Sequence, residues 1–181
     1  MPEALQENGE KPVILDLYCG VGTIGLYCAD EAEQIIGIEI VKDAVLDANR
    51  NAVVNGIVNA RYICGKAEEI LPLYTGQKKD AGRTANLKEA PSVKADPNLA
   101  EAISRASIAI LDPPRAGCRP ELLEAVIDLG VERIVYVSCD PATLARDIKF
   151  LGEHGYDLQE ATPVDMFPHT AEVETVCLLS R

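Results

Sequence analysis

Short apolar runs alternate with amphipathic stretches along most of this chain, and this alternation constrains its fold more than any other feature. The apolar runs are 13–17, 35–38, 60–64, 107–111 and 133–137, and apolar residues recur at helical spacing within 42–55, 66–73, 120–129 and 141–152. Strands without polar alternation, each followed by a helix, are typical of a parallel sheet covered on both faces. At 181 residues the chain fits one domain. We therefore predict a single α/β domain over residues 1–181.

Two segments depart from the alternation. Residues 75–98 are rich in Lys, Gly, Asp, Asn and Pro and carry little apolar periodicity, so we expect an exposed, mobile insertion there. Near the end of the chain, 157–162 and 173–179 have the character of strands, with no helix between them. They predict an antiparallel hairpin at the sheet edge, which brings the expected sheet to seven strands.

Composition and charge exclude several classes of protein. Hydrophobic residues make up 48% of the chain, which indicates a packed core rather than disorder. No apolar run approaches the roughly 20 residues of a membrane span, and the N-terminus lacks the basic start of a signal peptide. We therefore expect a soluble cytoplasmic protein without a membrane partner. The net charge of −12 excludes nucleic-acid binding through bulk electrostatics, so an RNA substrate requires a local basic patch or a further domain.

The cysteines indicate neither a metal site nor a disulfide framework. Six are present, at positions 19, 28, 64, 118, 139 and 177, with no C-x-x-C pair and no histidine in ligand spacing. Several lie inside apolar runs, where a thiol behaves as a small buried hydrophobe. We expect reduced thiols in a reducing compartment and no metal.

A glycine-rich turn follows the first apolar run and predicts a nucleotide cofactor. Residues 20–25 read G-V-G-T-I-G, and Glu39 ends the second run 19 residues after Gly20. Glycines allow close backbone approach, and a carboxylate at that distance binds ribose hydroxyls. This pattern also fits a nicotinamide-dependent oxidoreductase. Asp16, four places before Gly20, gives the turn the form it takes in S-adenosylmethionine-dependent methyltransferases, where an acidic group suits the ammonium and the sulfonium.

Two further strand ends carry reactive groups. Asp112-Pro113-Pro114-Arg115 ends the fourth run, and its prolines fix the backbone so that Asp112 is held at the strand end, where open α/β sheets bind ligands. Cys139 lies between the fifth run and the start of a helix, and the dipole of that helix favours a thiolate. Cys139 is thus a candidate nucleophile. Cys19 is the alternative, although its place within the glycine turn suits packing better.

Four motifs in order carry a family resemblance: D-L-Y-C-G-V-G-T at 16–23, D-P-P-R-A-G at 112–117, V-S-C-D-P-A-T-L-A-R-D at 137–147 and F-P-H-T-x-x-V-E-T-V at 167–176. With these motifs the chain resembles, over nearly its whole length apart from 75–98, the catalytic domain of the RNA uracil-5-methyltransferase family. That family makes 5-methyluridine in tRNA or ribosomal RNA. The resemblance implies a Rossmann-like class I methyltransferase fold and S-adenosylmethionine as cofactor.

The resemblance also implies site residues. Cys139 is expected to be the nucleophile that adds to C6 of uracil, and Glu174 the general base that removes the C5 proton, with His169 as the second candidate base. The cofactor is expected to contact the turn and four neighbouring strand ends, through Asp16, Tyr18, Gly20, Gly22, Thr23, Glu39, Lys66 and Asp112. Arg115 could serve an RNA phosphate or a uracil carbonyl. A looped or flipped uridine is implied, because a base inside a helix cannot present C5 and C6 to both groups.

The sequence departs from the family pattern in two respects. Family members usually carry an N-terminal RNA-binding domain and an insertion, sometimes with an iron–sulfur cluster held by four cysteines, and neither is evident here. We therefore expect a monomeric catalytic domain whose RNA binding needs a further domain. The family also often has Asn where Asp140 stands. Two other functions stay open: a catalytically silent methyltransferase-like module that binds RNA or a partner, and an NAD-dependent oxidoreductase, which gives Cys139 and Glu174 no role.

Overall fold

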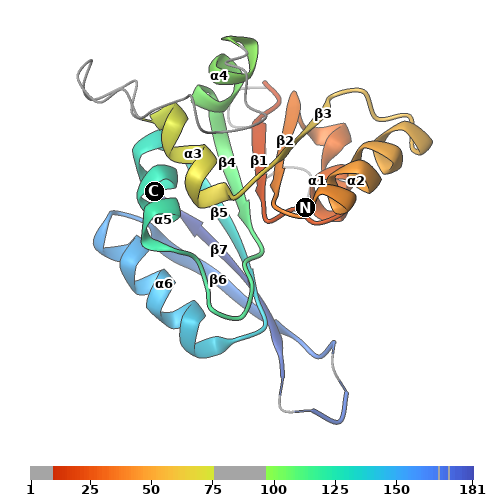
Figure 1. Ribbon diagram of the computed structural model, residues 1–181. Coiled ribbons are helices and arrows are strands. Elements are labelled where there is room, and N and C mark those ends of the chain that lie inside the picture. The colour runs from red at the N-terminus through yellow and green to blue at the C-terminus, as the bar shows by residue number, and fades with distance from the viewer. Residues whose placement is uncertain (1–9, 76–96, 167, 171) are drawn as a thin grey trace.

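A single seven-stranded sheet forms the centre of the protein, with helices on both of its faces (Figure 1). The computed structural model describes residues 10–75, 97–166, 168–170 and 172–181. The strands are β1 (Val13–Leu17), β2 (Gln34–Glu39), β3 (Ala60–Cys64), β4 (Ala106–Leu111), β5 (Arg133–Ser138), β6 (Asp157–Val164) and β7 (Glu174–Ser180). The helices are α1 (Thr23–Tyr27), the 3-10 helix η2 (Ala29–Glu31), α2 (Lys42–Val54), α3 (Ala67–Thr75), α4 (Pro97–Ser104), α5 (Pro120–Leu129) and α6 (Pro141–Glu153).

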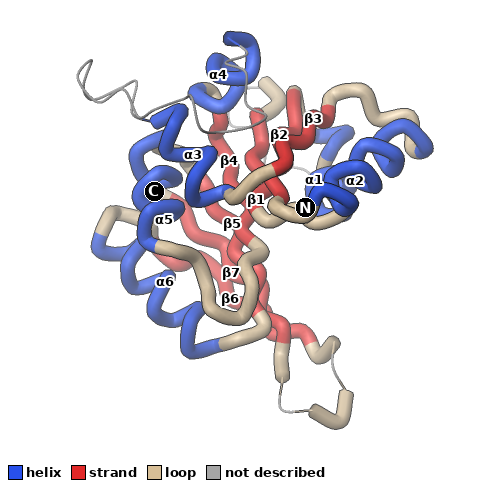
Figure 2. The backbone as a smooth tube through the Cα atoms, viewed as in Figure 1, coloured by secondary structure: helices blue, strands red, loops and turns tan. Residues whose placement is uncertain are grey.

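The strand order is β3-β2-β1-β4-β5-β7-β6. The first five strands in this order pair in parallel, and β7 pairs antiparallel with both β5 and β6. The predicted mostly parallel sheet with a C-terminal antiparallel hairpin is therefore confirmed. The order adds a detail that the sequence did not indicate, because β7 lies inside the sheet and β6 forms its edge (Figure 2).

The core has two parts, one on each face of the sheet. Leu15, Leu17 and their neighbours pack with residues of α3, α4, α5 and α6 in the larger part. Ile14 and Ile35 pack with Ala29 and Ala32 in the smaller part, on the α1 side. All five residues of β1 are buried, and this burial on both faces explains why four of them are apolar, with Asp16 as the exception.

Helix α4 and the end of α3 lie within or beside the segment expected to be a mobile insertion. Helix α3 extends to Thr75 and α4 begins at Pro97, so both ends of the predicted 75–98 segment are helical, and residues 76–96 lie outside the described residues. Leu99, Ala102 and Ile103 are buried on one face of α4. This helix was not expected from the sequence, because eight residues give too few turns for a periodicity to stand out from the polar segment before it.

We expect Ile103→Ala to lower the free energy of unfolding by about 2–5 kcal/mol, because it leaves a cavity under α4 in the larger part of the core. Glu101→Ala is the matched control, since Glu101 lies exposed on the same helix. Urea denaturation followed by circular dichroism measures both. Equal small effects of the two substitutions would show that α4 does not pack as described.

Candidate active site

The residues expected to act in the site meet along the edge of the sheet where the parallel strands terminate, which is not the lateral edge formed by β6. The carboxyl ends of the parallel strands β1, β2, β3, β4 and β5 lie along this edge. Strand β7 runs the opposite way, so its first residue, Glu174, reaches the same edge. The structure thus gathers the glycine turn, Glu39, Asp112, Cys139 and Glu174 from five separate places in the sequence. This is the edge at which open α/β sheets bind ligands.

The glycine turn after β1 is fastened to the end of β2. The Gly20 N–H donates to Oε2 of Glu39 at 3.0 Å, and the Val41 N–H donates to Oε1 at 2.8 Å. Gly22 has φ +80°, and a Cβ there would lie 2.5 Å from the hydroxyl oxygen of Tyr62. Glycine is therefore required at position 22 both for its conformation and for space.

Asp16 lies beneath this turn rather than on its surface. Its side chain is 1% exposed, and its Oδ2 accepts a hydrogen bond from the Gly25 N–H at 2.9 Å. Oδ1 is buried and has no hydrogen-bond partner among the described residues. Burial raises the pKa of Asp16 to about 6, against the hydrogen bond from Gly25, and the charge of Asp112 adds to the rise. Asp16 thus holds the start of α1, and its contact with a cofactor stays a prediction.

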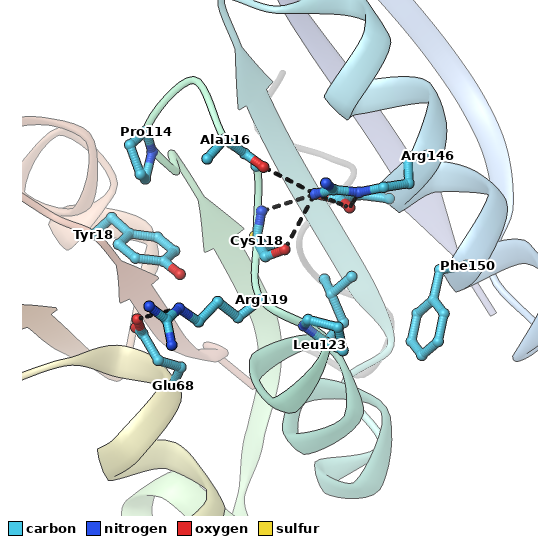
Figure 3. Close-up of a pocket in the computed structure, with 12 residues that line it drawn as sticks. Tyr18, Glu68, Pro114, Ala116, Cys118, Arg119, Leu123, Arg146 and Phe150 are labelled. Atoms are coloured by element: carbon cyan, nitrogen blue, oxygen red, sulfur yellow. Dashed lines mark hydrogen bonds and ion pairs between the residues drawn. The ribbon is translucent and has the colours of Figure 1, made fainter.

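The other predicted cofactor residues surround the turn. Tyr18 adopts φ +63°, donates its N–H to the Ile38 carbonyl at 3.0 Å and lines a cavity of about 510 Å³ (Figure 3). Thr23 is the first residue of α1 and is exposed. Lys66 follows β3, where its ammonium forms an ion pair with Glu69 at 2.6 Å. The structure therefore brings these residues to one edge of the sheet, where the Lys66 ammonium is paired with Glu69 of the following helix α3.

Cys139 is held in a capped turn between β5 and α6. The Ser138 hydroxyl donates to the Asp140 carbonyl at 3.0 Å and accepts from the Asp140 N–H at 3.1 Å. Oδ1 of Asp140 caps the helix by accepting from the N–H groups of Ala142 and Thr143, each at 2.9 Å. Cys139 is partly buried, and its thiol is free. An Asn side chain has the same capping ability as Asp, so the departure from the family at position 140 preserves the turn.

Glu174 begins β7, the strand next to the one that Cys139 follows. Ser138 pairs with Thr175 in the antiparallel register of β5 and β7, so one further step along both chains sets Cys139 opposite Glu174. Asp112 is nearby at the end of β4. Its side chain is exposed, but surrounding protein atoms partly desolvate the carboxyl and raise its pKa, and the charge of Glu174 raises it further. A thiol and two carboxylates therefore share this end of the sheet.

Arg115 has a contact that the sequence did not indicate. Its guanidinium forms an ion pair with Glu172, and hydrogen bonds and charges of Glu172 and then Cys139 raise the pKa of Arg115. The sequence could not show this contact, because it joins loops that follow different strands. The roles expected for Arg115 toward a phosphate or a uracil carbonyl stay predictions.

His169 lies in the connection between β6 and β7, where it is exposed and adopts φ +68°. Figure 1 shows that this connection extends away from the body of the sheet. Within the described residues, no group of three or more His, Cys, Asp or Glu side chains could hold a metal ion. No helix in that part of the chain is long and apolar enough to cross a membrane.

Comparison with known families and curated proteins gives a consistent result. The family described as tRNA (Uracil-5-)-methyltransferase matches residues 3–181. A Bacillus cereus protein named an RNA methyltransferase is 45% identical over 168 residues, which are 93% of this chain and 31% of that protein. A Lactobacillus johnsonii protein of the same name is 40% identical, over 98% of this chain and 34% of its own length. The chain therefore spans about a third of the length of these relatives.

Solved structures agree on the fold. The tRNA (uracil-54, C5)-methyltransferase of Pyrococcus abyssi, solved with S-adenosyl-L-homocysteine, has a TM-score of 0.69 and 34% identity, over 98% of this chain and 36% of that one. An rRNA methylase from Streptococcus thermophilus has a TM-score of 0.63 at 14% identity, over 99% of this chain and 90% of that one. The second likeness shows the fold alone. The Rossmann-like methyltransferase fold expected from the sequence is confirmed.

The raised pKa of Asp16 predicts a pH-dependent stability. Between the ordinary value of 3.8 and about 6, the folded protein keeps a proton that the unfolded chain has lost, so Asp16 makes the free energy of unfolding fall as pH rises through this window. Asp16→Asn cannot titrate and keeps an oxygen for Gly25. We expect the variant to gain about 2 kcal/mol relative to the wild type between pH 4 and pH 7.

Urea denaturation of the ligand-free protein at several pH values measures this difference. Asp30→Asn is the control, because Asp30 is an exposed carboxylate close to the end of α1. A wild-type-to-variant difference that stays constant from pH 4 to pH 7 would contradict the assignment.

Proposed function

Because this chain belongs to the tRNA (uracil-5-)-methyltransferase family, we propose that it transfers a methyl group from S-adenosylmethionine to C5 of a uridine in tRNA or ribosomal RNA. The observation that carries the proposal is the register of β5 and β7, which sets Cys139 opposite Glu174. A nucleophile and a base at the ends of neighbouring strands suit addition to a pyrimidine ring followed by proton removal. An oxidoreductase has no use for this pair.

The residues around the glycine turn fit an adenosine-type cofactor. Both oxygens of Glu39 accept one backbone hydrogen bond, and each has a further lone pair for a ribose hydroxyl. Ile40 follows directly and is 55% exposed, which leaves apolar surface for the flat face of a base. We expect Tyr18, Gly20, Gly22, Thr23, Lys66 and Asp112 to complete the site, with Asp16 supporting the turn. When bound, S-adenosylmethionine supplies a methyl group carried on a sulfonium cation.

Cys139 begins the reaction on the uracil ring. C5 of uracil is a poor nucleophile, so a covalent bond to the ring is needed to raise its electron density. The Cys139 thiolate adds to C6, and the electron pair of the C5–C6 double bond moves to give an enolate-like C5. The N-terminal end of α6 follows Cys139 directly, and the carbonyl of Arg115 is bonded to the first turn of the same helix. The dipole of this helix favours the negative charge that attack requires.

Glu174 completes the reaction after C5 has taken the methyl group. Its carboxylate removes the C5 proton, the C5–H electron pair forms the C5–C6 double bond again, and the bond between C6 and Sγ breaks to return the Cys139 thiolate. The partial exposure of Glu174 leaves it open to a base placed at the sheet edge. RNA binding is expected to draw on a domain outside this chain, since the net charge of −12 opposes binding to a polyanion.

Glu39 tests the cofactor assignment. We expect Glu39→Ala to weaken binding of S-adenosylhomocysteine roughly ten- to hundredfold, because it removes a charged acceptor for the ribose hydroxyls. Isothermal titration calorimetry measures the affinity. Glu33→Gln is the control, because Glu33 lies just before β2 at the opposite edge of the sheet and pairs with Arg105. Unchanged affinity in Glu39→Ala would contradict the assignment.

Cys139 and Glu174 should differ in the step they block. Cys139→Ala is expected to give neither methyl transfer nor a protein–RNA adduct. Glu174→Gln should still form the adduct and accept the methyl group, so a covalent, methylated protein–RNA complex should accumulate on ordinary uridine. Denaturing gels with radiolabelled methyl groups detect it as a slow band, with an RNA-binding domain of a relative added if the chain alone binds no RNA.

Glu160→Gln is the control for this experiment, because Glu160 is an exposed carboxylate on the neighbouring strand β6. Turnover of Glu174→Gln at the wild-type rate would make Glu174 a structural residue of β7 and His169 the better candidate base. Methyl transfer by Cys139→Ala would overturn the covalent route.

A further inference from the structure

A buried carboxylate on α6 joins the loop after β4 to the helix that follows Cys139. Asp147 is 2% exposed. Its Oδ2 accepts hydrogen bonds from the Cys118 N–H at 2.8 Å and the Tyr136 hydroxyl at 2.6 Å, and its Oδ1 accepts from Nε of Arg146 at 2.8 Å. An ionised carboxylate is costly to bury unless its oxygens are satisfied, and here both are.

Arg146 extends this network to the loop backbone. Its Nη2 donates to the carbonyls of Ala116 at 3.0 Å and Cys118 at 3.3 Å, as Figure 3 shows. The Thr143 hydroxyl donates to the Arg115 carbonyl at 3.1 Å, one turn earlier on α6. Three residues on two consecutive turns of the helix therefore hold the loop at Arg115, Ala116 and Cys118.

Gly117 shows how closely the loop and helix approach. It adopts φ +75°, and a Cβ at this position would lie 2.5 Å from Nη2 of Arg146 and 2.7 Å from Oδ2 of Asp147. A side chain at residue 117 would therefore displace the network. The sequence D-P-P-R-A-G thus ends in glycine because the two charged groups of α6 occupy the space beside it.

The network connects two parts of the reaction site. Helix α6 begins two residues after Cys139, and the loop carries Arg115, whose carbonyl accepts the hydrogen bond from Thr143 in the first turn of that helix. The Arg115 side chain is 68% exposed, so few packing contacts restrict it. Glu172 pairs with its guanidinium, and the hydrogen bonds from α6 hold its backbone next to the turn that carries Cys139.

We propose that Asp147, together with Arg146, is a positioning residue that fixes residues 115–118 on α6 and thereby keeps Arg115 next to the turn that carries Cys139. The inference rests on the proposed function in one respect, the assignment of Cys139 as the reacting thiol. It assigns no contact with RNA or cofactor to Asp147. Asp147 acts on Cys139 through Arg115, and this dependence distinguishes its role from a general contribution to stability.

The test measures alkylation of individual cysteines by iodoacetamide in the intact chain, followed by peptide mass spectrometry. We expect Arg115→Ala to slow alkylation of Cys139 about two- to fivefold, as for loss of an exposed charge pair, and Arg115→Lys to retain most of the rate. Asp147→Asn should slow it by a similar factor. In the Arg115→Ala background, Asp147→Asn should have no further effect, since residues that act through one contact are not additive.

Two other thiols report whether the change is local. Burial raises the pKa of the Cys118 thiol to about 12, so Cys118 should react slowly in the wild type and faster when Asp147→Asn releases the loop. Cys177 is buried in β7, where it pairs in register with Tyr136, and should stay protected as long as the sheet stays folded. Glu124→Gln is the matched control, an exposed carboxylate on α5, and is expected to leave all three rates unchanged.

Three results would overturn the proposal. The first is an unchanged Cys139 rate in Asp147→Asn when Arg115→Ala slows it. The second is an equal effect of Asp147→Asn in both backgrounds. If Asp147→Asn unfolds the protein and exposes Cys177, Tyr136→Phe and Thr143→Val take its place, because each removes one bond of the network. The third overturning result is then that neither of these two variants slows alkylation of Cys139. Alkylation needs no RNA, so failure of the proposed function appears separately, as absence of the methylated RNA adduct.

Discussion

The antiparallel pairing of β7 with β5 is the interaction on which the proposed site depends. Parallel strands end at one edge of the sheet and begin at the other, so a sheet of parallel strands alone brings only residues that follow strands to the ligand-binding edge. Strand β7 runs back between β5 and β6 and delivers a residue that begins a strand. This reversal places Glu174 opposite Cys139, although 35 positions separate them in the sequence.

Carboxylates that accept backbone hydrogen bonds fix the loops around that edge. Asp16 binds the Gly25 N–H, Glu39 binds two N–H groups at the ends of β1 and β2, and Asp147 binds the Cys118 N–H. Asp140 caps α6 in the same way. Each of these bonds is charge-assisted and therefore stronger and more directional than a neutral one. Part of the acidic excess of this chain thus serves to hold four loops in place.

Most elements could be predicted from local patterns, and the exceptions have physical causes. Buried parallel strands and helices of ten or more residues leave a periodicity that a reader can count, as in 13–17 and 120–129. Helix α4 has only eight residues, so tertiary packing of Ile103 decides it rather than propensity. The glycine turn, Asp112 and Cys139 could be proposed as site residues because motifs and strand ends mark them. The ion pair of Arg115 with Glu172 and the network of Asp147 left no local pattern.

The sequence by itself determined the α/β class, the alternation of strand and helix, the glycine turn with Glu39, and the family to which the four motifs belong. These depend on periodicity and on residue types at fixed spacing, which are properties of neighbouring residues. Only the tertiary structure decided that β7 lies inside the sheet, that Asp16 points beneath the turn, and that Asp147 ties the loop after β4 to α6. Those features depend on which strand edges pair and which groups lose water together, and both follow from how distant segments pack.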